Sequence, residues 1–384
     1  PDEREEMRQD FNDYDLIISS YSTISRDVAE LNQESIIFSF AILDEAQHIK
    51  NHRTKRAKAV KNIEAESRLA LTGTPLENSV EELWSIFDFL MPGYLGNYSY
   101  FKKNFSKPIK KNNKKKKMTE LKERVAPFIL RRRKGEVLKE LPEKIVNVHP
   151  VSMTQLQEDS YQTVLEEVRG ELEQTVEEKG FNRSRINVLA ALTKLRQICN
   201  HPALVLGEEG KVHNSGKLEA LRELLSDALS GGHKIIIFSQ FVKMLKLIRD
   251  DLEQQGINYL YLDGSTRKRM EKVREFNSNP EVEIFLISLK AGGVGLNLTA
   301  ADMVVHVDPW WNPMVERQAT DRAHRLGQEN RVMVYKMITR GTVEEKMLKL
   351  QQRKQDLFNN IIENNVNPIK AISWEDIQDL LAYK

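Results

Sequence analysis

Cysteine is nearly absent from the sequence, which has Cys199 alone among 384 residues. A disulfide framework is therefore excluded, and the composition fits a reducing compartment. The eight histidines stand without paired cysteines, which argues against a structural zinc site. No apolar run is long enough to span a bilayer, and the acidic, polar opening PDEREEMRQD does not resemble a signal peptide. With 40% hydrophobic and 30% charged residues, we expect a soluble, globular protein.

The distribution of charge is more informative than the net charge of +2. Residues 102–117, KKNFSKPIKKNNKKKK, contain no acid, and RRRK follows at 131–134. The lysine run is either a solvated, mobile loop or a patch that binds nucleic-acid phosphates and displaces their counterions. Composition alone leaves both interpretations open.

Apolar runs alternate with helical stretches in two parts of a chain whose length exceeds one comfortable core. In the first part, strands are expected at 15–20, 40–46 and 68–74, with helices at 23–31 and 54–63. In the second part, strands are expected at 234–240, 257–264, 282–288 and 302–308, with helices at 241–255 and 266–277. The pattern is mostly helical from about 81 to 200 and again in a tail at 343–363. This rhythm predicts an α/β fold with parallel sheets.

Two adjacent carboxylates end one of the apolar runs, in AILDEAQHIKN at 41–51. Ligand sites in open parallel sheets collect at the carboxyl ends of strands, where Asp44 and Glu45 are expected. A nucleotide hydrolase needs one carboxylate for Mg²⁺ and another to orient or deprotonate the attacking water. Asp44 suits the first role and Glu45 the second. The pair alone is weak evidence, because acids are common at helix N-termini.

One strand later, the sequence LTGTPLENS predicts a tight turn at Thr72, Gly73 and Thr74. Its hydroxyls and backbone amides would lie beside the two carboxylates. The alternative is an ordinary loop between a strand and a helix.

The segment WNPMVERQATDRAHRLGQ predicts one helix, with Asn312 as N-cap, Pro313 at the first helical position and Gly327 just after the end. Four polar side chains would share one face at i, i+3, i+4 and i+7, namely Gln318, Asp321, Arg322 and Arg325. Such a face is either a surface ion-pair helix or a triphosphate site, because planar guanidinium forks match phosphate oxygens.

Four further segments are candidates for phosphate contact. AGGVG at 291–295 and the turn at Gly264, Ser265 and Thr266 could bring backbone amides close to an anion. The bland alternatives are a simple turn and an N-cap by one of the two hydroxyls. Polar candidates also stand at Ser239 and Gln240, which end an expected strand, and at Ser20 and Tyr21, which a capped helix start would equally explain.

Taken together, these segments resemble the SWI/SNF-type ATPases, which are DNA translocases of helicase superfamily two. DEAQ and LTGTPLEN resemble motifs II and III, IIIFSQF resembles motif IV, and ISLKAGGVGLNLTAADMVVHVDPWWNP resembles motif V with its flank. QATDRAHRLGQ resembles motif VI, and LRRRKGEVLKELPEK and LRQICNHPALV are similar to segments between the lobes. The match covers nearly the whole chain in order.

The resemblance implies two RecA-like parallel-sheet lobes, the first one incomplete, with helical insertions between them and a helical C-terminal tail. The domains would be the first lobe with its basic loop, a helical insertion, the second lobe, and a tail that packs on it: 1–145, 146–210, 211–342 and 343–384. ATP would bind in the cleft between the lobes, with Mg²⁺ on Asp44, water activated by Glu45, and arginine fingers from Arg322 and Arg325.

The other site residues also come from the resemblance. The expected nucleotide contacts are Gln47, Thr72, Gly73, Gly293, Gln318 and Asp321. The expected contacts to the phosphate backbone of double-stranded DNA are Ser20, Tyr21, Ser239, Gln240, Gly264, Ser265, Thr266, Lys290 and Gly292. The position of Lys290 is often arginine in this family, so charge is kept but the bidentate fork is lost.

A phosphate-cradling G-x-x-x-x-G-K-[ST] sequence does not occur among the 384 residues. The family places this loop upstream of DEAQ, so we expect a chain truncated at its N-terminus and without ATPase activity by itself. Three rivals to duplex translocation stay open: a strand-separating DNA or RNA helicase, a non-catalytic DNA-binding fragment, and a nucleosome remodeller, which would need histone-binding modules. The Lys- and Asn-rich composition leans towards a prokaryotic, cytoplasmic and nucleoid-associated protein; a eukaryotic one would be nuclear.

Overall fold

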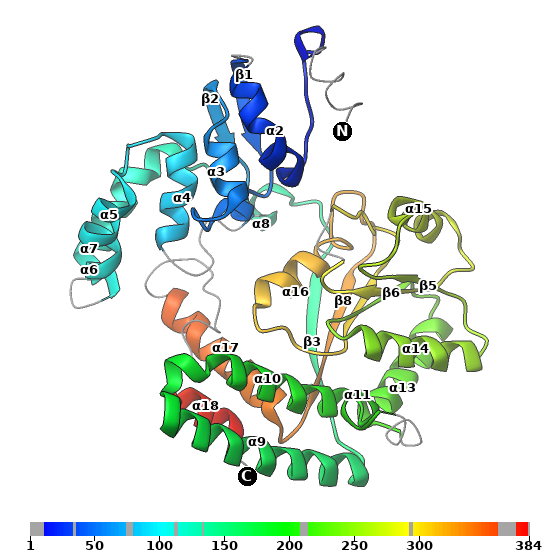
Figure 1. Cartoon of the computed structure of the whole chain (residues 1–384). Helices are drawn as coiled ribbons and strands as arrows, with labels where there is room; N and C mark the ends of the chain where they lie inside the picture. The colour runs from blue at the N-terminus through cyan, green and yellow to red at the C-terminus, as the bar shows by residue number, and fades with distance from the viewer. Residues whose placement is uncertain are drawn as a thin grey trace. The chain divides into compact units, whose positions relative to one another are not determined.

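The computed structural model describes residues 11–33, 36–73, 80–110, 114–132, 134–207, 214–291, 295–359 and 374–382. These residues belong to two compact units, one up to Arg131 and one from Arg132 onward (Figure 1). Residues 132–145, which were predicted to belong to the first domain, fall in the second unit because β3 (Lys144–Val151) pairs with a strand there.

The first unit is built on two parallel strands, β1 (Phe38–Leu43) and β2 (Ala65–Ala70). Four helices accompany them, after a short 3₁₀ turn, η1, at Phe11–Asp13: α2 (Tyr21–Gln33), η2 (Ala46–Ile49), α3 (Lys55–Lys61) and α4 (Val80–Leu90). The buried side chains of this layer are Ala41, Leu43, Ala46, Ile49, Ala57, Val60, Ile86 and Phe89. Two of the three predicted strands, at 40–46 and 68–74, and both predicted helices are confirmed.

The strand predicted at 15–20 is wrong. The segment is irregular, and Leu16 and Ile18 are 73% and 87% exposed. A strand is stabilised by hydrogen bonds to a neighbour, and within the described residues only β1 and β2 pair with each other in this unit. The apolar sequence alone does not supply such a partner.

A helical extension completes the first unit. One continuous helix runs through α5 (Tyr98–Phe101), the π-helical turn η3 (Lys102–Ser106) and α6 (Lys107–Lys110). It packs against α7 (Lys114–Val125), which continues into η4 (Ala126–Phe128). Their shared core contains Trp84, Phe87, Phe101, Phe105, Ile109, Leu121 and Val125.

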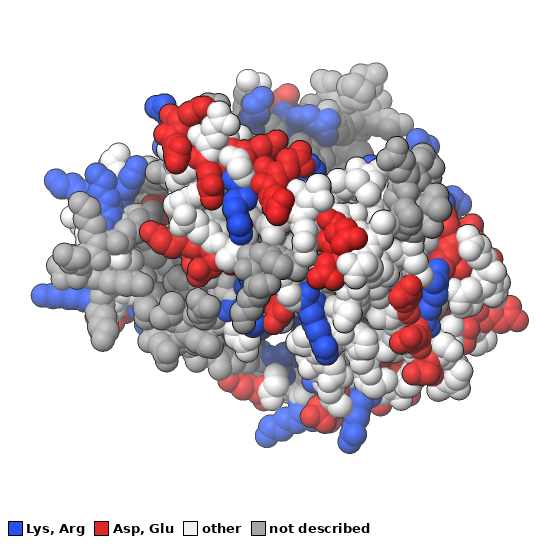
Figure 2. All heavy atoms as spheres, turned by 90° about the horizontal axis from the view of Figure 1, so that it is seen from below, with Lys and Arg blue, Asp and Glu red and all other residues white. Residues whose placement is uncertain are grey.

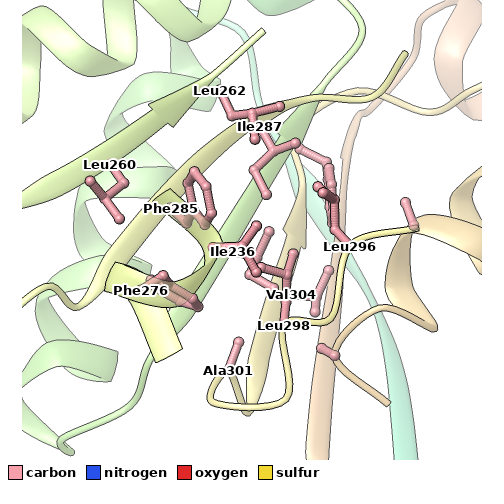
Figure 3. Close-up of a cluster of buried hydrophobic side chains, with 14 of the residues drawn as sticks. Ile236, Leu260, Leu262, Phe276, Phe285, Ile287, Leu296, Leu298, Ala301 and Val304 are labelled. Atoms are coloured by element: carbon pink, nitrogen blue, oxygen red, sulfur yellow. The ribbon is translucent and has the colours of Figure 1, made fainter. Parts of the chain in front are cut away.

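The second unit contains a six-stranded, all-parallel sheet in the order β3-β8-β7-β4-β6-β5. Its other strands are β4 (Ile235–Ser239), β5 (Tyr259–Leu262), β6 (Ile284–Ser288), β7 (Met303–His306) and β8 (Val332–Thr339). Every residue of β4, β6 and β7 is buried, as expected for central strands covered on both faces. Figure 3 shows how Ile236, Phe285 and Val304 from three of these strands meet in one apolar layer.

Helices α13 (Gly216–Ser230), α14 (Val242–Gln254) and α15 (Arg269–Ser278) connect the strands. Strands β4 to β7 are correctly predicted from the sequence, but β3 and β8, which form one edge of the sheet, were not expected. In β3 most positions are exposed or half-buried, and the strand contains Asn147, His149 and Pro150. This composition hides the apolar signal on which the prediction depends, and it is tolerated because an edge strand needs only one partner.

A helical layer lies beside this sheet. It contains α9 (Gln155–Lys179), α10 (Phe181–Asn200), α17 (Val343–Asn359) and α18 (Trp374–Leu381), with the shorter α8 (Lys134–Val137), α11 (Ala203–Leu206) and α16 (Pro313–Thr320) elsewhere in the unit (Figure 1). Val343 and Met347 of the tail share a buried cluster with Leu192 of α10 and with Trp311. None of the helices among the described residues is both long enough and apolar enough to cross a bilayer.

Candidate active site

The ends of β1 and β2 bring two of the predicted motifs into contact. The Leu71 N–H donates to the Leu43 carbonyl at 2.7 Å, and the Ala46 N–H donates to the Leu71 carbonyl at 2.9 Å. These bonds extend the strand pairing into the segments that follow, as the carboxyl-end rule predicts. Thr72 therefore lies beside DEAQ, while the neighbouring Thr74 is outside the described residues.

Gln47 joins the two segments through its side-chain amide. Its Nε2 donates to Glu45 Oε2 at 2.5 Å, and its Oε1 accepts from Thr72 Oγ1 at 2.7 Å. A fixed chain of hydrogen bonds thus runs from Thr72 to the Glu45 carboxylate. It restricts the orientation of a carboxylate that is only half-buried, which is what a general base requires.

The backbone of Glu45 is strained. Its φ and ψ angles of 50° and 51° lie in the left-handed region, and it is the only non-glycine residue with positive φ in the described part of the chain. This conformation costs about 1–3 kcal/mol for a residue with a Cβ, and such residues cluster at functional sites. Here it ends β1 and starts η2, so that Glu45 folds back towards Gln47.

Asp44 has the properties of a Mg²⁺ ligand. Its carboxylate is exposed, Oδ1 accepts the Glu45 N–H at 2.9 Å, and no lysine, arginine or histidine of the described residues pairs with it. Mg²⁺ is usually held by one or two carboxylates together with waters and substrate phosphates. One exposed aspartate without a cationic partner among the described residues fits that donor set.

Tyr21 supports the same strand end from the start of α2. Its hydroxyl donates to the Asp44 carbonyl at 2.7 Å, and its ring lies 5.3 Å from that of His48. Burial, with the charges of Asp44 and Glu45, raises the pKa of Tyr21 to about 12. In this structure the Tyr21 hydroxyl is hydrogen-bonded to the backbone of Asp44. The DNA contact predicted for Tyr21 stays a prediction.

Ser20 caps α2, because its Oγ accepts the Thr23 N–H at 3.1 Å. The alternative of a capped helix start is therefore confirmed for this residue. Its side chain is also exposed, so the cap does not prevent a phosphate contact.

The helix predicted from Asn312 to Gly327 is correct only in its first half. Asn312 is the N-cap, with Oδ1 accepting the Met314 N–H at 3.1 Å, but α16 ends at Thr320. Two contacts from elsewhere in the unit compete with the helix. Thr320 Oγ1 is 2.9 Å from His306 Nε2, and the Arg322 carbonyl accepts the Leu298 N–H at 3.0 Å.

The four polar residues of this segment consequently do not share one helix face. Gln318 lies half-buried on α16, Arg322 is 5% exposed, and Arg325 is exposed in the turns after the helix, with Nη1 3.5 Å from the Leu296 carbonyl. Asp321 caps the helix C-terminus. The prediction of a single face with two guanidiniums is wrong, although both arginines stay in one short segment.

Asp321 has two lysine partners that were not expected from the sequence. Its Oδ1 lies 3.1 Å from Lys144 Nζ and 3.4 Å from Lys134 Nζ. Lys134 is partly desolvated, and this burial lowers its pKa. The cations belong to the segment that follows the first unit, which brings positive charge close to Arg325.

Two of the predicted DNA contacts at the end of β4 point inward. Ser239 is 1% exposed, and its hydroxyl donates to the buried carboxylate of Asp308. Gln240 Oε1 accepts from Arg196 Nη1 at 3.2 Å. In this structure the Ser239 hydroxyl therefore supports Asp308 and is not presented to a ligand.

The turn after β5 is open to solvent. Gly264 and Ser265 are exposed, and Asp263 Oδ1 accepts from Ser265 N at 2.8 Å and from Ser265 Oγ at 2.6 Å. These hydrogen bonds lower the pKa of Asp263. Thr266 Oγ1 accepts the Asp263 N–H at 3.0 Å. Because α15 starts only at Arg269, the alternative of simple helix capping by Ser265 or Thr266 is wrong.

The last predicted phosphate loop is only partly described. Lys290 is exposed at its start. Gly292 and Gly293, predicted to contact DNA and nucleotide, lie outside the described residues. Among the described residues, no group of three or more His, Cys, Asp or Glu side chains forms a metal site.

A buried charged network in the second unit was not anticipated from the sequence. Lys217 Nζ donates to Glu344 Oε1 at 2.8 Å, to the Val307 carbonyl at 2.8 Å and to Asn200 Oδ1 at 3.0 Å. The side chains of Lys217 and Glu344 are fully buried. The network joins the starts of α13 and α17 to the end of β7 and of α10. The one available signal was a lysine close to apolar residues, in SGKLEAL.

We expect Lys217→Met to lower the free energy of unfolding by about 3 kcal/mol, because it leaves Glu344 as a buried charge without its cation. Urea unfolding checks this. Adding Glu344→Gln removes the stranded charge and should restore part of the loss. The control Lys349→Met breaks an exposed pair with Glu345 and should cost less than about 1 kcal/mol. Equal losses for Lys217→Met and Lys349→Met would contradict the role given to the network.

Comparison with known families divides the chain at a different place from the two compact units, because the first family match extends beyond Arg131. The SNF2-related domain family matches residues 2–204, slightly more than half of the chain. The chain belongs to this family. The helicase conserved C-terminal domain matches residues 216–327 of the same SNF2-related chain.

Individual relatives come from bacteria and eukaryotes. An uncharacterized ATP-dependent helicase of Mycoplasma pneumoniae is 38% identical over 365 residues, covering 94% of this chain and 34% of that protein. The TATA-binding protein-associated factor MOT1 of Saccharomyces cerevisiae is 35% identical over 435 residues, covering 99% of this chain and 23% of that protein. The SNF2-related chain thus spans only about a quarter to a third of these relatives. The leaning towards a prokaryotic origin stays a prediction.

Solved structures agree with the fold. The Sulfolobus solfataricus SWI2/SNF2 ATPase core in complex with double-stranded DNA gives a TM-score of 0.54 at 39% identity, covering 97% of this chain and 78% of that chain. The C-terminal domain of that core gives a TM-score of 0.51 at 35% identity, covering 63% of this chain and all of that chain. The parallel sheets of the SNF2-related chain are therefore those of RecA-like lobes, as the motifs implied.

Proposed function

We propose that this chain supplies the hydrolytic carboxylates and the arginines of an ATP-driven motor that translocates along double-stranded DNA. The observation that carries the proposal is the hydrogen-bonded chain Thr72–Gln47–Glu45 beside the exposed Asp44. Asp44 and Glu45 follow the same strand, β1, and this adjacency supports a magnesium ligand and a base acting together, as phosphoryl transfer to water requires. Membership of the SNF2-related family supports the same chemistry.

Each carboxylate has its own role in the proposal. Glu45 orients and deprotonates the attacking water, and Gln47 holds its carboxylate in place. Asp44 would hold Mg²⁺, and a bound Mg²⁺ would neutralise charge on the phosphates of the nucleotide. Tyr21 keeps the Asp44 backbone fixed through its carbonyl.

The proposal assigns Arg322 and Arg325 to the charge that develops on the transferred phosphoryl group. Arg325 is the more direct candidate because its side chain is exposed, whereas Arg322 is largely buried. An arginine at this position lowers the barrier by electrostatic stabilisation, since a guanidinium matches phosphoryl oxygens. Gln318 and Asp321 would position this segment.

DNA recognition in the proposal is independent of sequence. The exposed residues Gly264 and Lys290 offer a backbone amide and a cation to phosphates, whereas the amide and the hydroxyl of Ser265 already donate to Asp263. Such contacts carry no base information but make binding depend strongly on salt.

Triplex displacement tests the proposal against strand separation. In an ATP-hydrolysing protein that contains this chain, we expect ATP-dependent displacement of the third strand of a triplex, and no separation of a forked duplex in stopped flow. Strand separation would favour a helicase that acts on DNA or RNA strands. DNA binding without ATP turnover in such a protein would favour a non-catalytic DNA-binding module.

A further inference from the structure

The continuous helix 98–110 of the first unit buries its apolar side chains, and this packing leaves lysines on its solvent-facing side. Phe101, Phe105 and Ile109 recur every four residues, are at most 6% exposed, and pack against α7. Side chains four residues apart share one helix face, so Lys103 and Lys107 lie together on the opposite, exposed face. The orientation of these cations is therefore fixed by packing.

The charge on this face is not compensated by its neighbours. Lys102, Lys103 and Lys107 are exposed and form no ion pair within the described part of the chain. On the adjacent helix α7 the situation differs, because Lys117 and Arg124 both pair with Glu120, at 2.7 and 3.0 Å. Uncompensated cations on one face attract an external polyanion and release its counterions.

Aromatic side chains accompany the lysines. Lys102 Nζ lies 5.8 Å from the centre of the Tyr98 ring, and Tyr100, three residues before Lys103, is 49% exposed. At the left of Figure 2, where α5 to α7 lie, Lys and Arg predominate over Asp and Glu. Lysine carries a strongly hydrated point charge and lacks the planar, bidentate geometry of arginine. The surface is therefore better suited to binding phosphates than to recognising specific bases.

We propose that Lys102, Lys103 and Lys107 form a second contact for the phosphate backbone of duplex DNA, separate from the motif segments of both units. Lys103 and Lys107 are about one helical turn, or roughly 6 Å, apart along the axis. B-DNA carries one phosphate per about 1.7 Å of its axis, so both cations can meet phosphates of one duplex. This role rests on the proposed DNA-binding function. It adds the lysine-rich segment, for which a solvated loop was the alternative interpretation, to the surface that binds DNA.

The test is the salt dependence of duplex binding, measured by fluorescence anisotropy of a labelled duplex over a KCl series. We expect the variant K102Q/K103Q/K107Q to bind more weakly than the wild-type chain. The slope of log affinity against log salt should fall by about 0.9 for each phosphate that the variant no longer neutralises, up to about 2.7 for three. The variant K102R/K103R/K107R keeps the charge and should keep the slope.

The matched control removes three charges from the solvent face of α3 in the same unit, as K55Q/R56Q/K58Q. These side chains are exposed and form no ion pair with described residues. Circular dichroism melts verify that both triple variants fold. A slope for K102Q/K103Q/K107Q equal to that of the control would overturn the inference and leave an acidic protein as the partner of this surface. Failure of the wild-type chain to bind duplex DNA would instead overturn the proposed function itself.

Discussion

Replacing Arg325 by alanine in an ATP-hydrolysing protein that contains this chain should reduce the rate of ATP hydrolysis by about 10³–10⁵, the effect of losing an arginine finger. Arg325 is exposed, and the one described hydrogen bond of its side chain is a long contact of 3.5 Å to the Leu296 carbonyl. Its truncation therefore leaves no buried cavity or stranded partner, and stability should change by less than about 0.5 kcal/mol. Steady-state phosphate release at saturating duplex DNA measures the effect.

DNA binding separates this role from a general loss of positive charge. We expect Arg325→Ala to bind duplex DNA as tightly as the wild type at equal salt. The matched control is Arg331→Ala, which removes an exposed arginine six residues further along the same unit and should keep full ATPase activity. ATP hydrolysis at the normal rate in Arg325→Ala would refute the assignment. Arg322 is a less informative target, because its guanidinium is buried. Removing it can destabilise the fold, and a loss of activity would then not report on catalysis alone.

The central strands could be predicted from the sequence because parallel strands buried on both faces are continuous apolar runs. IIIFS and IFLIS are of this kind, and both form strands where expected. The strand wrongly predicted at 15–20 and the strand β3 that was missed have the same cause. DLIISS has an apolar run but no partner strand among the described residues, whereas β3 has a partner but no such run. Pairing depends on residues far away in the chain, which a local pattern does not contain.

The helix after Asn312 illustrates the same limit at the site. Its start was predictable, because an N-cap and a proline act locally. Its end was not, because His306 and Leu298 bind Thr320 and Arg322 from other parts of the unit. Within the site, the proximity of DEAQ to Thr72 followed from the rule that parallel strand ends meet. The left-handed backbone of Glu45 could not be anticipated, since glutamate carries a Cβ and rarely adopts it.

The buried ion pair of Lys217 and Glu344 could not be predicted from the local sequence, for a further reason. The two residues are 127 positions apart in the sequence, and each alone is typical of an exposed helix start. Only the packing of α13 and α17 on the end of β7 makes them partners. Local sequence patterns would place both charged side chains at the surface, but packing places them in the core.

Glu45→Gln should reduce ATP hydrolysis by about 10²–10⁴, the usual contribution of a general base, while ATP and duplex DNA still bind. Glutamine has the same size, and its side-chain oxygen can still accept the hydrogen bond from Gln47 Nε2. What it lacks is the ability to take a proton from water. Rapid-quench measurement of a single turnover isolates the hydrolytic step from product release.

The hydrogen-bonded chain predicts a graded result for its other members. Gln47→Ala keeps the base but removes the hydrogen bond from Gln47 Nε2 to its carboxylate, so the rate should fall by about tenfold, as expected for the loss of one hydrogen bond worth about 1.4 kcal/mol. Glu64→Gln neutralises an exposed glutamate just before β2 and should have no effect. If Glu45→Gln hydrolyses ATP at more than half the normal rate, Glu45 is not the base, and the strained backbone at this position needs another explanation. If Gln47→Ala instead equals Glu45→Gln, the orientation of the carboxylate matters as much as its basicity.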